Sequence, residues 1–343
     1  ARSTGLAVRP SSPVLLAVSG GPDSTALMHA AARLAPAGSI HVATVDHRLR
    51  PGSAAEAEAV AAKAARLGLA HHLLVREGEA PATRLQAEAR RARYALLAAC
   101  AGRIGADRVL TGHNLDDQAE TVLLRLCAGS GPAGLAGMRG ARALARGVTL
   151  GRPFLALAKA QLAAWCEAGG IAFLRDPSNA DDRFARARLR RLSPILAREG
   201  LDPARLARLA ERLARDDAAL SRTARDAFAG LRIDAERGVR LGSPAALPEA
   251  VTLRVIALAM AEAGAEGPER LERLEALVLG TLLPALREGR AVCRTLRGLT
   301  VETTLRGEVV LAPAPPRKGG NAVRGRADGL LGKGSPAAYI DDE

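Results

Sequence analysis

A short polar segment between an apolar run and a helical pattern holds residue types that bind phosphate. The apolar run at 14–18 ends in Ser19-Gly20-Gly21-Pro22-Asp23-Ser24. Glycines let a backbone approach a phosphate closely, and N–H groups at a helix start direct positive partial charge at it. Asp23 alone would repel phosphate, which favours a divalent cation between the two. We therefore predict that residues 19–24 bind a nucleotide, with Asp23 as a Mg²⁺ ligand.

The same segment has a purely structural alternative, in which Asp23 or Ser24 caps the helix and nothing binds. The segment lacks the Gly-Lys-Ser/Thr of a Walker motif, and Gly-x-Gly-x-x-Gly is absent, so neither a P-loop NTPase nor a Rossmann dehydrogenase is favoured. The choice between a cap and a binding loop therefore depends on other parts of the chain.

Two further polar clusters follow apolar runs. Asp46 and His47 end the run at 40–45, and the polar stretch TGHNLDD at 111–117 follows the run at 108–111. Carboxylates such as Asp46, Asp116 and Asp117 can bind a cation or accept a proton. The structural alternative for Asp116 and Asp117 is a pair of acids at a helix start, and for His113 a hydrogen-bonded turn residue. No His, Cys and acid spacing matches a zinc site.

Apolar runs that alternate with helical patterns predict an α/β fold. Strands are expected at 14–18, 40–45, 69–75 and 108–111, and a fifth from Ile171; helices are expected at 24–35, 53–67 and 82–104. Such an alternation is typical of a doubly wound parallel sheet with right-handed crossovers. Ligands of these sheets bind beyond the carboxyl ends of the strands. The three polar clusters are therefore expected at one edge of one sheet.

Four segments make up the predicted domain organisation. Residues 1–200 form the catalytic domain and 201–235 a helical linker, with Asp202 as N-cap and Pro203 at the first helical position. Residues 236–312 form a smaller α+β domain, helical over 245–287, with short strands over 291–312 that turn at Arg306-Gly307. The Pro, Gly and charge content of 313–343 is typical of a flexible tail.

Charge and composition narrow the class of protein. The net charge of +13 over 343 residues favours polyanionic partners, and 183–198 is rich in arginine. The four cysteines, none in Cys-x-x-Cys spacing, are expected to be buried and reduced, and Trp165 is expected in the core. No segment resembles a membrane span or a secretion signal, which predicts a cytoplasmic protein.

Jointly, the motifs resemble those of the N-type ATP pyrophosphatases (the PP-loop superfamily), and within it the tRNA(Ile)-lysidine synthetases. The matching segments, which run from about 14 to 190, are SGGPDSTAL, VDHRLRPGSAAEA with Asp46, His47 and Arg50, EARRARYALL with Arg90, Arg93 and Tyr94, GHNLDDQAETVLLRLCAGSG, GRPFLALAKAQL and DPSNADDRFARARLR. Two positions depart from the family pattern. Ala187 stands where the family usually has Asn, and Asn114 stands where a second His is common.

The resemblance implies an adenine-nucleotide alpha hydrolase-like fold and a defined reaction. ATP adenylates O2 of the wobble cytidine of a CAU-anticodon tRNA(Ile), and the ε-amine of free L-lysine then displaces AMP from C2. The implied cofactors are ATP and Mg²⁺, and the C-terminal domain is expected to bind tRNA; a homodimer is one expectation for the assembly. The implied catalytic residues are Asp23, Asp46, Asp116 and Asp117, with Asp116 and Asp117 binding lysine and Arg93, Arg186 and Arg190 binding tRNA.

Three alternatives stay open at this point. A tRNA thiolase would use the same ATP loop but commonly has paired cysteines, which this chain lacks. An amidating synthetase for a small molecule fits the basic charge and the Arg-rich helix poorly. A non-catalytic RNA-binding protein with a decayed nucleotide fold is disfavoured because Asp23, Asp116 and Asp117 are intact.

Overall fold

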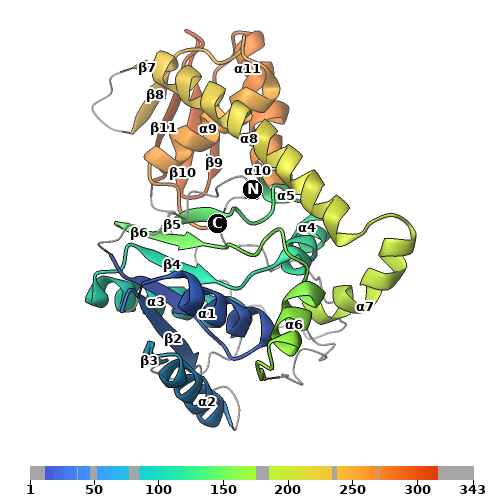
Figure 1. The fold of residues 1–343 in the computed structure, drawn as a ribbon. Coiled ribbons are helices and arrows are strands. Elements are labelled where there is room, and N and C mark those ends of the chain that lie inside the picture. The colour runs from blue at the N-terminus through green and yellow to red at the C-terminus, as the bar shows by residue number, and fades with distance from the viewer. Residues whose placement is uncertain are drawn as a thin grey trace, which may run out of the picture. The chain divides into compact units, whose positions relative to one another are not determined.

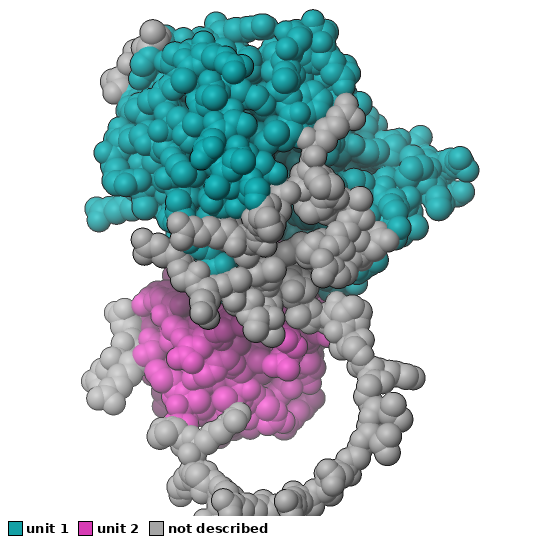
Figure 2. Space-filling view, turned by 90° about the horizontal axis from the view of Figure 1, so that it is seen from below, with its two compact units in different colours: residues 1–129, 134–211 teal, residues 130–133, 212–343 magenta. Residues whose placement is uncertain are grey.

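The computed structural model describes residues 12–36, 38–46, 52–76, 85–174, 185–233, 238–268 and 270–315, and every structural statement concerns these residues. The chain divides into two compact units (Figure 2). The first comprises residues 1–129 and 134–211, and the second comprises residues 130–133 and 212–343. The four-part domain division proposed from sequence stays a prediction.

The first unit is built on a six-stranded sheet of order β3-β2-β1-β4-β6-β5 (Figure 1). The strands are β1 (Val14–Ala17), β2 (Ile40–Asp46), β3 (Ala70–Val75), β4 (Arg108–Thr111), β5 (Ala141–Ala145) and β6 (Val148–Gly151). Every neighbouring pair is parallel except β5 and β6, which are antiparallel. The predicted α/β class is confirmed, with an antiparallel strand added at one edge.

The strand register brings the loops after β1 and β4 to the same edge. In this register Ala17 lies opposite Ala43 of β2 and opposite Thr111 of β4. The segments that begin after Ala17 and Thr111 therefore leave the sheet side by side, and β2 ends nearby at Asp46. This confirms that the three polar clusters share one sheet edge.

Helices cover both faces of this sheet, because successive strand residues point to opposite faces. Leu16 packs with residues of α1 (Pro22–Leu34) and α2 (Ser53–Arg66), whereas Leu15 packs with residues of α3 (Leu85–Ile104). Both leucines are fully buried. Helix α6 (Lys159–Ala168) packs on α1 through a small cluster of Ala26, Leu162, Cys166 and Ile171.

The fifth strand predicted from Ile171 is wrong. Residues 171–174 have no regular secondary structure, and the N–H of Leu174 donates to the carbonyl of Gly20 at 2.8 Å. The additional strands are instead the hairpin β5–β6, which turns at 146–147. Its sequence ARALARGVTL is dominated by Ala and Arg, which favour helices, so its first half lacks the β-branched signal of a strand.

Two helices at the end of the first unit pack on α4 (Leu115–Cys127). They are α7 (Ala185–Arg198) and the first part of α8 (Pro203–Leu231). Leu206 and Ala210 of α8 share a buried cluster with Val122 of α4. The predicted start of α8 is confirmed, since Oδ1 of Asp202 accepts the N–H of Arg205 at 2.8 Å and Pro203 is the first helical residue.

The second unit has its own antiparallel sheet of order β7-β8-β11-β10-β9. Its elements are β7 (Arg232–Ile233), β8 (Val239–Leu241), α9 (Glu249–Glu262), α10 (Leu271–Leu277), the π-helical segment Val278–Leu282, α11 (Leu283–Arg287), β9 (Val292–Leu296), β10 (Leu299–Thr303) and β11 (Val309–Pro313); the short α5 (Pro132–Leu135) belongs partly to this unit. The strands expected over 291–312 and their turn at Arg306-Gly307 are confirmed. The expected helical stretch is interrupted between α9 and α10.

Two expectations about the core are wrong. All four cysteines are free, but Cys127 and Cys293 are exposed, and only Cys100 and Cys166 are buried. Trp165 is 36% exposed on α6, where the guanidinium of Arg33 lies 5.2 Å from the centre of its ring. Among the described residues, no helix combines the length and the apolar character that a membrane crossing requires.

Candidate functional site

The loop after β1 is held in shape by its own hydroxyl groups. Oγ of Ser24 accepts the N–H of Ser19 at 3.2 Å and lies 3.2 Å from the carbonyl oxygen of Gly21. The buried hydroxyl of Thr25 donates to the carbonyl of Gly20 at 3.1 Å. Gly20 has φ +88°, which favours glycine, and an added Cβ would lie 2.6 Å from a methyl of Leu174. The loop is therefore preformed around a position where glycine is needed.

The N-terminus of α1 is open toward this loop. Its N-cap is Gly21, which has no side chain to bond the first N–H groups, and Pro22 occupies the first turn. The structural alternative, in which Asp23 or Ser24 caps the helix, is not observed, since both lie within α1. The first-turn N–H groups and the helix dipole are thus left to attract an anion.

Asp23 presents a carboxylate of which one oxygen is not satisfied by the protein. Its Oδ1 is buried and has no hydrogen-bond partner among the described residues. Burial raises the pKa of Asp23, and the positive charge of Lys159 opposes this shift. No group of three or more His, Cys, Asp or Glu side chains in the described chain could hold a metal alone. Mg²⁺ usually takes one or two carboxylates and completes its shell with water and substrate phosphates, so Asp23 fits such a site.

The segment after β4 packs directly against the loop after β1. A Cβ at Gly112 would lie 2.9 Å from the carbonyl carbon of Asp23 and 3.0 Å from the backbone N of Ser24. Only a glycine therefore permits this approach of the two backbones. The contact places the start of α4 beside the start of α1, so Asp117 and Asp116 lie near enough to raise the pKa of Asp23. The region around these acids and the loop after β1 is called the crevice below.

Asp117, which is predicted to bind lysine, also caps the start of α4. Asn114 and Asp117 form a capping box, in which Asn114 N–H donates to Oδ2 of Asp117 at 3.1 Å and Asp117 N–H donates to Oδ1 of Asn114 at 3.0 Å. Burial raises the pKa of Asp117, and its hydrogen bond with the Asn114 backbone opposes the shift. Asn114, which stands where the family commonly has a second His, thus supplies the N-cap of α4.

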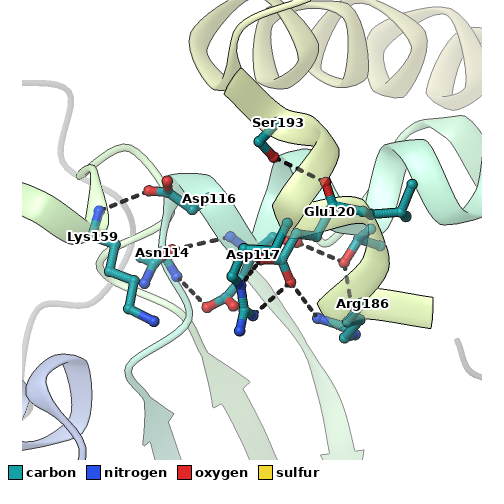
Figure 3. A network of polar contacts seen from close by, with 10 residues as sticks. Asn114, Asp116, Asp117, Glu120, Lys159, Arg186 and Ser193 are labelled. Atoms are coloured by element: carbon teal, nitrogen blue, oxygen red, sulfur yellow. Dashed lines mark hydrogen bonds and ion pairs between the residues drawn. The ribbon is translucent and has the colours of Figure 1, made fainter. Parts of the chain in front are cut away.

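Asp116 fixes a neighbouring helix. Its Oδ2 accepts the backbone N–H of Lys159, the first residue of α6, at 2.7 Å (Figure 3). Asp116 and Asp117 also line a small cavity. The other residues that line it are Ala119, Glu120, Lys159, Arg190, Ser193 and Pro203. This cavity brings together acidic and basic side chains from α4, α6 and α7.

Glu120 is a buried acid of this site that the sequence reasoning missed. It is 5% exposed and forms a bidentate pair with Arg190, with Nε to Oε1 at 2.8 Å and Nη2 to Oε2 at 3.1 Å. Arg186 lies 3.7 Å from Oε2 of the same carboxylate. The signal was present, because Glu120 follows Asp117 by three residues and Asp116 by four, which places all three on one helix face.

The arginines predicted to bind tRNA on α7 therefore have partners inside the protein. Arg186 and Arg190 hold α7 against α4 through Glu120, and the hydrogen bond to Glu120 raises the pKa of Arg190. Figure 3 shows Arg186 and Glu120. Ala187, at the position of the family Asn, is buried in α7. Arg93 is exposed on α3. The role of the three arginines toward tRNA stays a prediction.

His113 is neutral at physiological pH. Burial, followed by the charges of Arg152, Arg90, Arg186 and Arg93, lowers the pKa of His113 to about 3. Its Nδ1 lies 2.7 Å from Oγ1 of Thr111. The imidazole can therefore take part in hydrogen bonds but does not supply positive charge.

Of the remaining predicted residues, Asp46 is buried at the carboxyl end of β2. His47, Arg50 and most of the motif at 176–190, up to residue 184, lie outside the described residues. Lys159, which the sequence reasoning had not singled out, joins the site through Asp116.

Comparisons with known proteins match this chain to one family and to several named relatives. A family model for the PP-loop domain matches residues 3–196. A tRNA(Ile)-lysidine synthase of Methylobacterium sp. (strain 4-46) is 57% identical over 311 residues, which cover 89% of this chain and 90% of that protein. Another, of Rhodopseudomonas palustris, is 47% identical over 320 residues, covering 89% and 92%.

Among solved structures, the U34-tRNA thiolase NcsA from Methanococcus maripaludis is similar with a TM-score of 0.51 and 16% identity, covering 60% of this chain and 73% of that one. This likeness concerns the fold alone, and it agrees with the expected adenine-nucleotide alpha hydrolase-like class.

Proposed function

Because the chain belongs to the tRNA(Ile)-lysidine synthase family, we propose that the crevice of its first unit joins free lysine to the wobble cytidine of a CAU-anticodon tRNA(Ile) through an adenylated intermediate. The protein is a ligase that forms a carbon–nitrogen bond, and its product is lysidine. Different residues of the crevice would serve the two steps of this reaction.

The open start of α1 is suited to the first step. ATP would place its β- and γ-phosphates on the free N–H groups of the loop after β1 and of the first turn of α1, with the hydroxyls of Ser19 and Ser24 as additional donors. O2 of the cytidine then attacks the α-phosphorus, and the bond to the pyrophosphate oxygen breaks. Asp23 would hold the Mg²⁺ that offsets the negative charge of the departing pyrophosphate.

The acids at the start of α4 are suited to the second step. Free lysine carries a positive ε-ammonium, which Asp116 and Asp117 would attract into the cavity that they line. The amine must lose a proton before it attacks C2 and displaces AMP, and the raised pKa of Asp117 makes its carboxylate a better proton acceptor than an ordinary aspartate. Asp46, at the same sheet edge, would add negative charge. The observation that carries the proposal is this juxtaposition of an open helix start with acids of α4, fixed by the contact at Gly112.

The tRNA would be bound by Arg93, Arg186 and Arg190 near the crevice and by the second unit at a distance from the anticodon. We also propose a cytoplasmic location, where tRNA and free lysine are available, and a homodimer as the assembly. The net charge of +13 supports a polyanionic partner.

The test is transfer of radiolabelled lysine to a CAU-anticodon tRNA(Ile) with ATP and Mg²⁺. The wild-type protein should label the tRNA, and Asp117→Ala should lower the rate by at least a hundredfold. That variant also loses a capping interaction of about 1 kcal/mol, so Asp117→Asn, which keeps an oxygen at the cap, separates charge from folding. Asp107→Ala, at the opposite end of β4, is the matched control and should keep full activity.

Two outcomes would favour other functions. Incorporation of sulfur in place of lysine would indicate a thiolase, and tRNA binding without ATP consumption would indicate a non-catalytic RNA-binding protein. Full lysine transfer by Asp117→Asn would remove the role assigned to this carboxylate.

A further inference from the structure

Lys159 is a charged residue of the crevice to which the proposed reaction has so far given no role. It is one of four lysines in a chain otherwise rich in arginine, and it is the first residue of α6. We propose that Lys159 is a catalytic residue whose ammonium binds the phosphates of ATP. This inference rests on the proposed function, of which it names a further residue.

The backbone of Lys159 is fixed from two sides. Oδ2 of Asp116 accepts its N–H at 2.7 Å, a bond that spans 43 residues of sequence. Helix α6 also packs on α1 through Leu162 and Cys166, and Sγ of Cys166 lies 3.8 Å from the carbonyl oxygen of Pro22. Helix α6 is thereby held against α1, at whose start the phosphates are proposed to bind.

The side chain of Lys159 is directed into the crevice and left without an ion pair. In Figure 3 it extends away from Asp116 and past Asn114. No ion pair within 4 Å joins its ammonium to any acid of the described chain, although its positive charge lowers the pKa of Asp23 and, to a smaller extent, that of Asp117. The buried Oδ1 of Asp23 likewise has no partner in that part of the chain. An ammonium and a carboxylate that share a crevice without pairing leave room for a ligand that contacts both.

The chemistry of that ligand follows from the charges. A phosphate chain with bound Mg²⁺ offers oxygens to the ammonium and a cation to the carboxylate, so it can contact both groups at once. The open N–H groups of α1 favour the same anion. The alternative is that the Lys159 ammonium occupies the place of the substrate amine and must be displaced by it.

Binding of Mg²⁺ and α,β-methylene-ATP, measured by calorimetry without tRNA or free lysine, tests this inference. Lys159→Met should weaken nucleotide binding about 10- to 100-fold, the range expected for a lost charge-assisted hydrogen bond, and Lys159→Arg should restore most of it. The matched control is Lys63→Met on α2, which removes the same charge from the first unit and should leave binding unchanged. In the transfer assay, KM for lysine should stay within about twofold in Lys159→Met.

Unchanged nucleotide binding in Lys159→Met would overturn the inference. If KM for lysine fell at the same time, the alternative place of Lys159 in the amine site would be supported instead. A wild-type protein that binds the nucleotide but labels no tRNA would contradict the proposed function and leave the assignment of Lys159 intact, so the two failures are distinguishable.

Discussion

At the scale of single residues, the crevice holds carboxylates at a cost to the stability of the folded protein. Asp23 has a buried oxygen without a partner among the described residues, and burial raises the pKa of both Asp23 and Asp117. Such groups are retained where a ligand supplies the missing interaction. The crevice is therefore expected to gain stability when nucleotide and Mg²⁺ bind.

The variant Asp23→Asn tests this cost through the pH dependence of the melting temperature. A carboxyl whose pKa is raised by folding stabilises the folded state below its ordinary pKa of 3.8 and loses that contribution as the pH rises through the raised value. At pH 7 the variant should therefore melt at a higher temperature than the wild type, by roughly 1–3 °C. The difference should shrink as the pH falls toward 4, which thermal unfolding at a series of pH values will measure.

The same variant should respond less to its ligand. Addition of Mg²⁺ and ATP should raise the melting temperature of the wild-type protein more than that of Asp23→Asn, because the variant lacks the proposed metal ligand. A wild-type melting temperature below that of the variant at pH 4 and above it at pH 7 would contradict the expected sign of the pH dependence.

The sequence predicted several acidic residues of the crevice but not the hydrogen bonds that they make to other parts of the protein. Asp23, Asp116 and Asp117 could be predicted because their motifs follow strands that end at one sheet edge and because these motifs resemble those of a known family. The bond from Asp116 to the backbone of Lys159 could not, since nothing local to either residue indicates a contact across 43 positions. Glu120 could have been found from its spacing on α4, whereas Lys159 required the packing of α6 on α1.

At the scale of elements, two helix starts lie side by side and differ in what they leave open. Helix α4 is closed by the Asn114–Asp117 capping box, whereas α1 has the bare cap Gly21. The proposed phosphate site therefore depends on α1 and on the close backbone contact between Gly112 and Asp23, which holds the two helix starts together.

Gly112→Ala is expected to damage this arrangement. The added methyl would lie 2.9 Å from the carbonyl carbon of Asp23, a backbone atom that cannot move without disturbing the loop. We expect a loss of about 1–3 kcal/mol in the free energy of unfolding, typical of overpacking, and at least tenfold weaker nucleotide binding.

Gly102→Ala is the matched control. This glycine lies inside α3 with no atom within 4 Å of an added Cβ, so the same change should stabilise the protein by about 0.5–1 kcal/mol and leave nucleotide binding unchanged. Equal stability and binding in both variants, measured by urea unfolding and calorimetry, would show that the contact at Gly112 is not tight.

The elements themselves were predictable where hydrophobic residues were β-branched or periodic. Strands β1 to β4 and helix α8 followed from such patterns and from the Asp202 cap. The hairpin β5–β6 did not, because its Ala and Arg side chains prefer helices and its pairing with β4 is a tertiary contact. The run from Ile171 has a strand composition, but it lies outside the sheet and bonds the Gly20 carbonyl instead.

At the scale of the whole molecule, the excess of positive charge is the main sign of a nucleic-acid partner. The net charge of +13 follows from the composition. The composition does not say which arginines pair with acids inside the protein and which are available to contact RNA. Arg186 and Arg190 illustrate this, because both contact Glu120 and both stand at positions assigned to tRNA binding.

Salt dependence of tRNA affinity can separate these two roles. Replacing Arg186 and Arg190 with Gln should weaken tRNA binding and reduce the slope of log K against log salt by about 2, one for each lost phosphate contact. Arg66→Gln, exposed in the last turn of α2, is the control and should leave the slope unchanged.

Glu120→Gln completes the comparison, because it loosens α7 from α4 without removing either arginine. If Glu120→Gln lowered the slope as much as the double replacement does, the arginines would act only by docking α7. Filter binding of tRNA(Ile) at several salt concentrations provides the measurement.

The hydrogen bond from Leu174 to Gly20 gives the molecule an intrinsic reporter. Its length is 2.8 Å, and it joins the nucleotide loop to a segment more than 150 positions away. The Leu174 amide can exchange its hydrogen with deuterated solvent only when the two segments separate. Its exchange rate, followed by mass spectrometry while ligands are added, therefore reads out how often the loop detaches from the chain that follows α6.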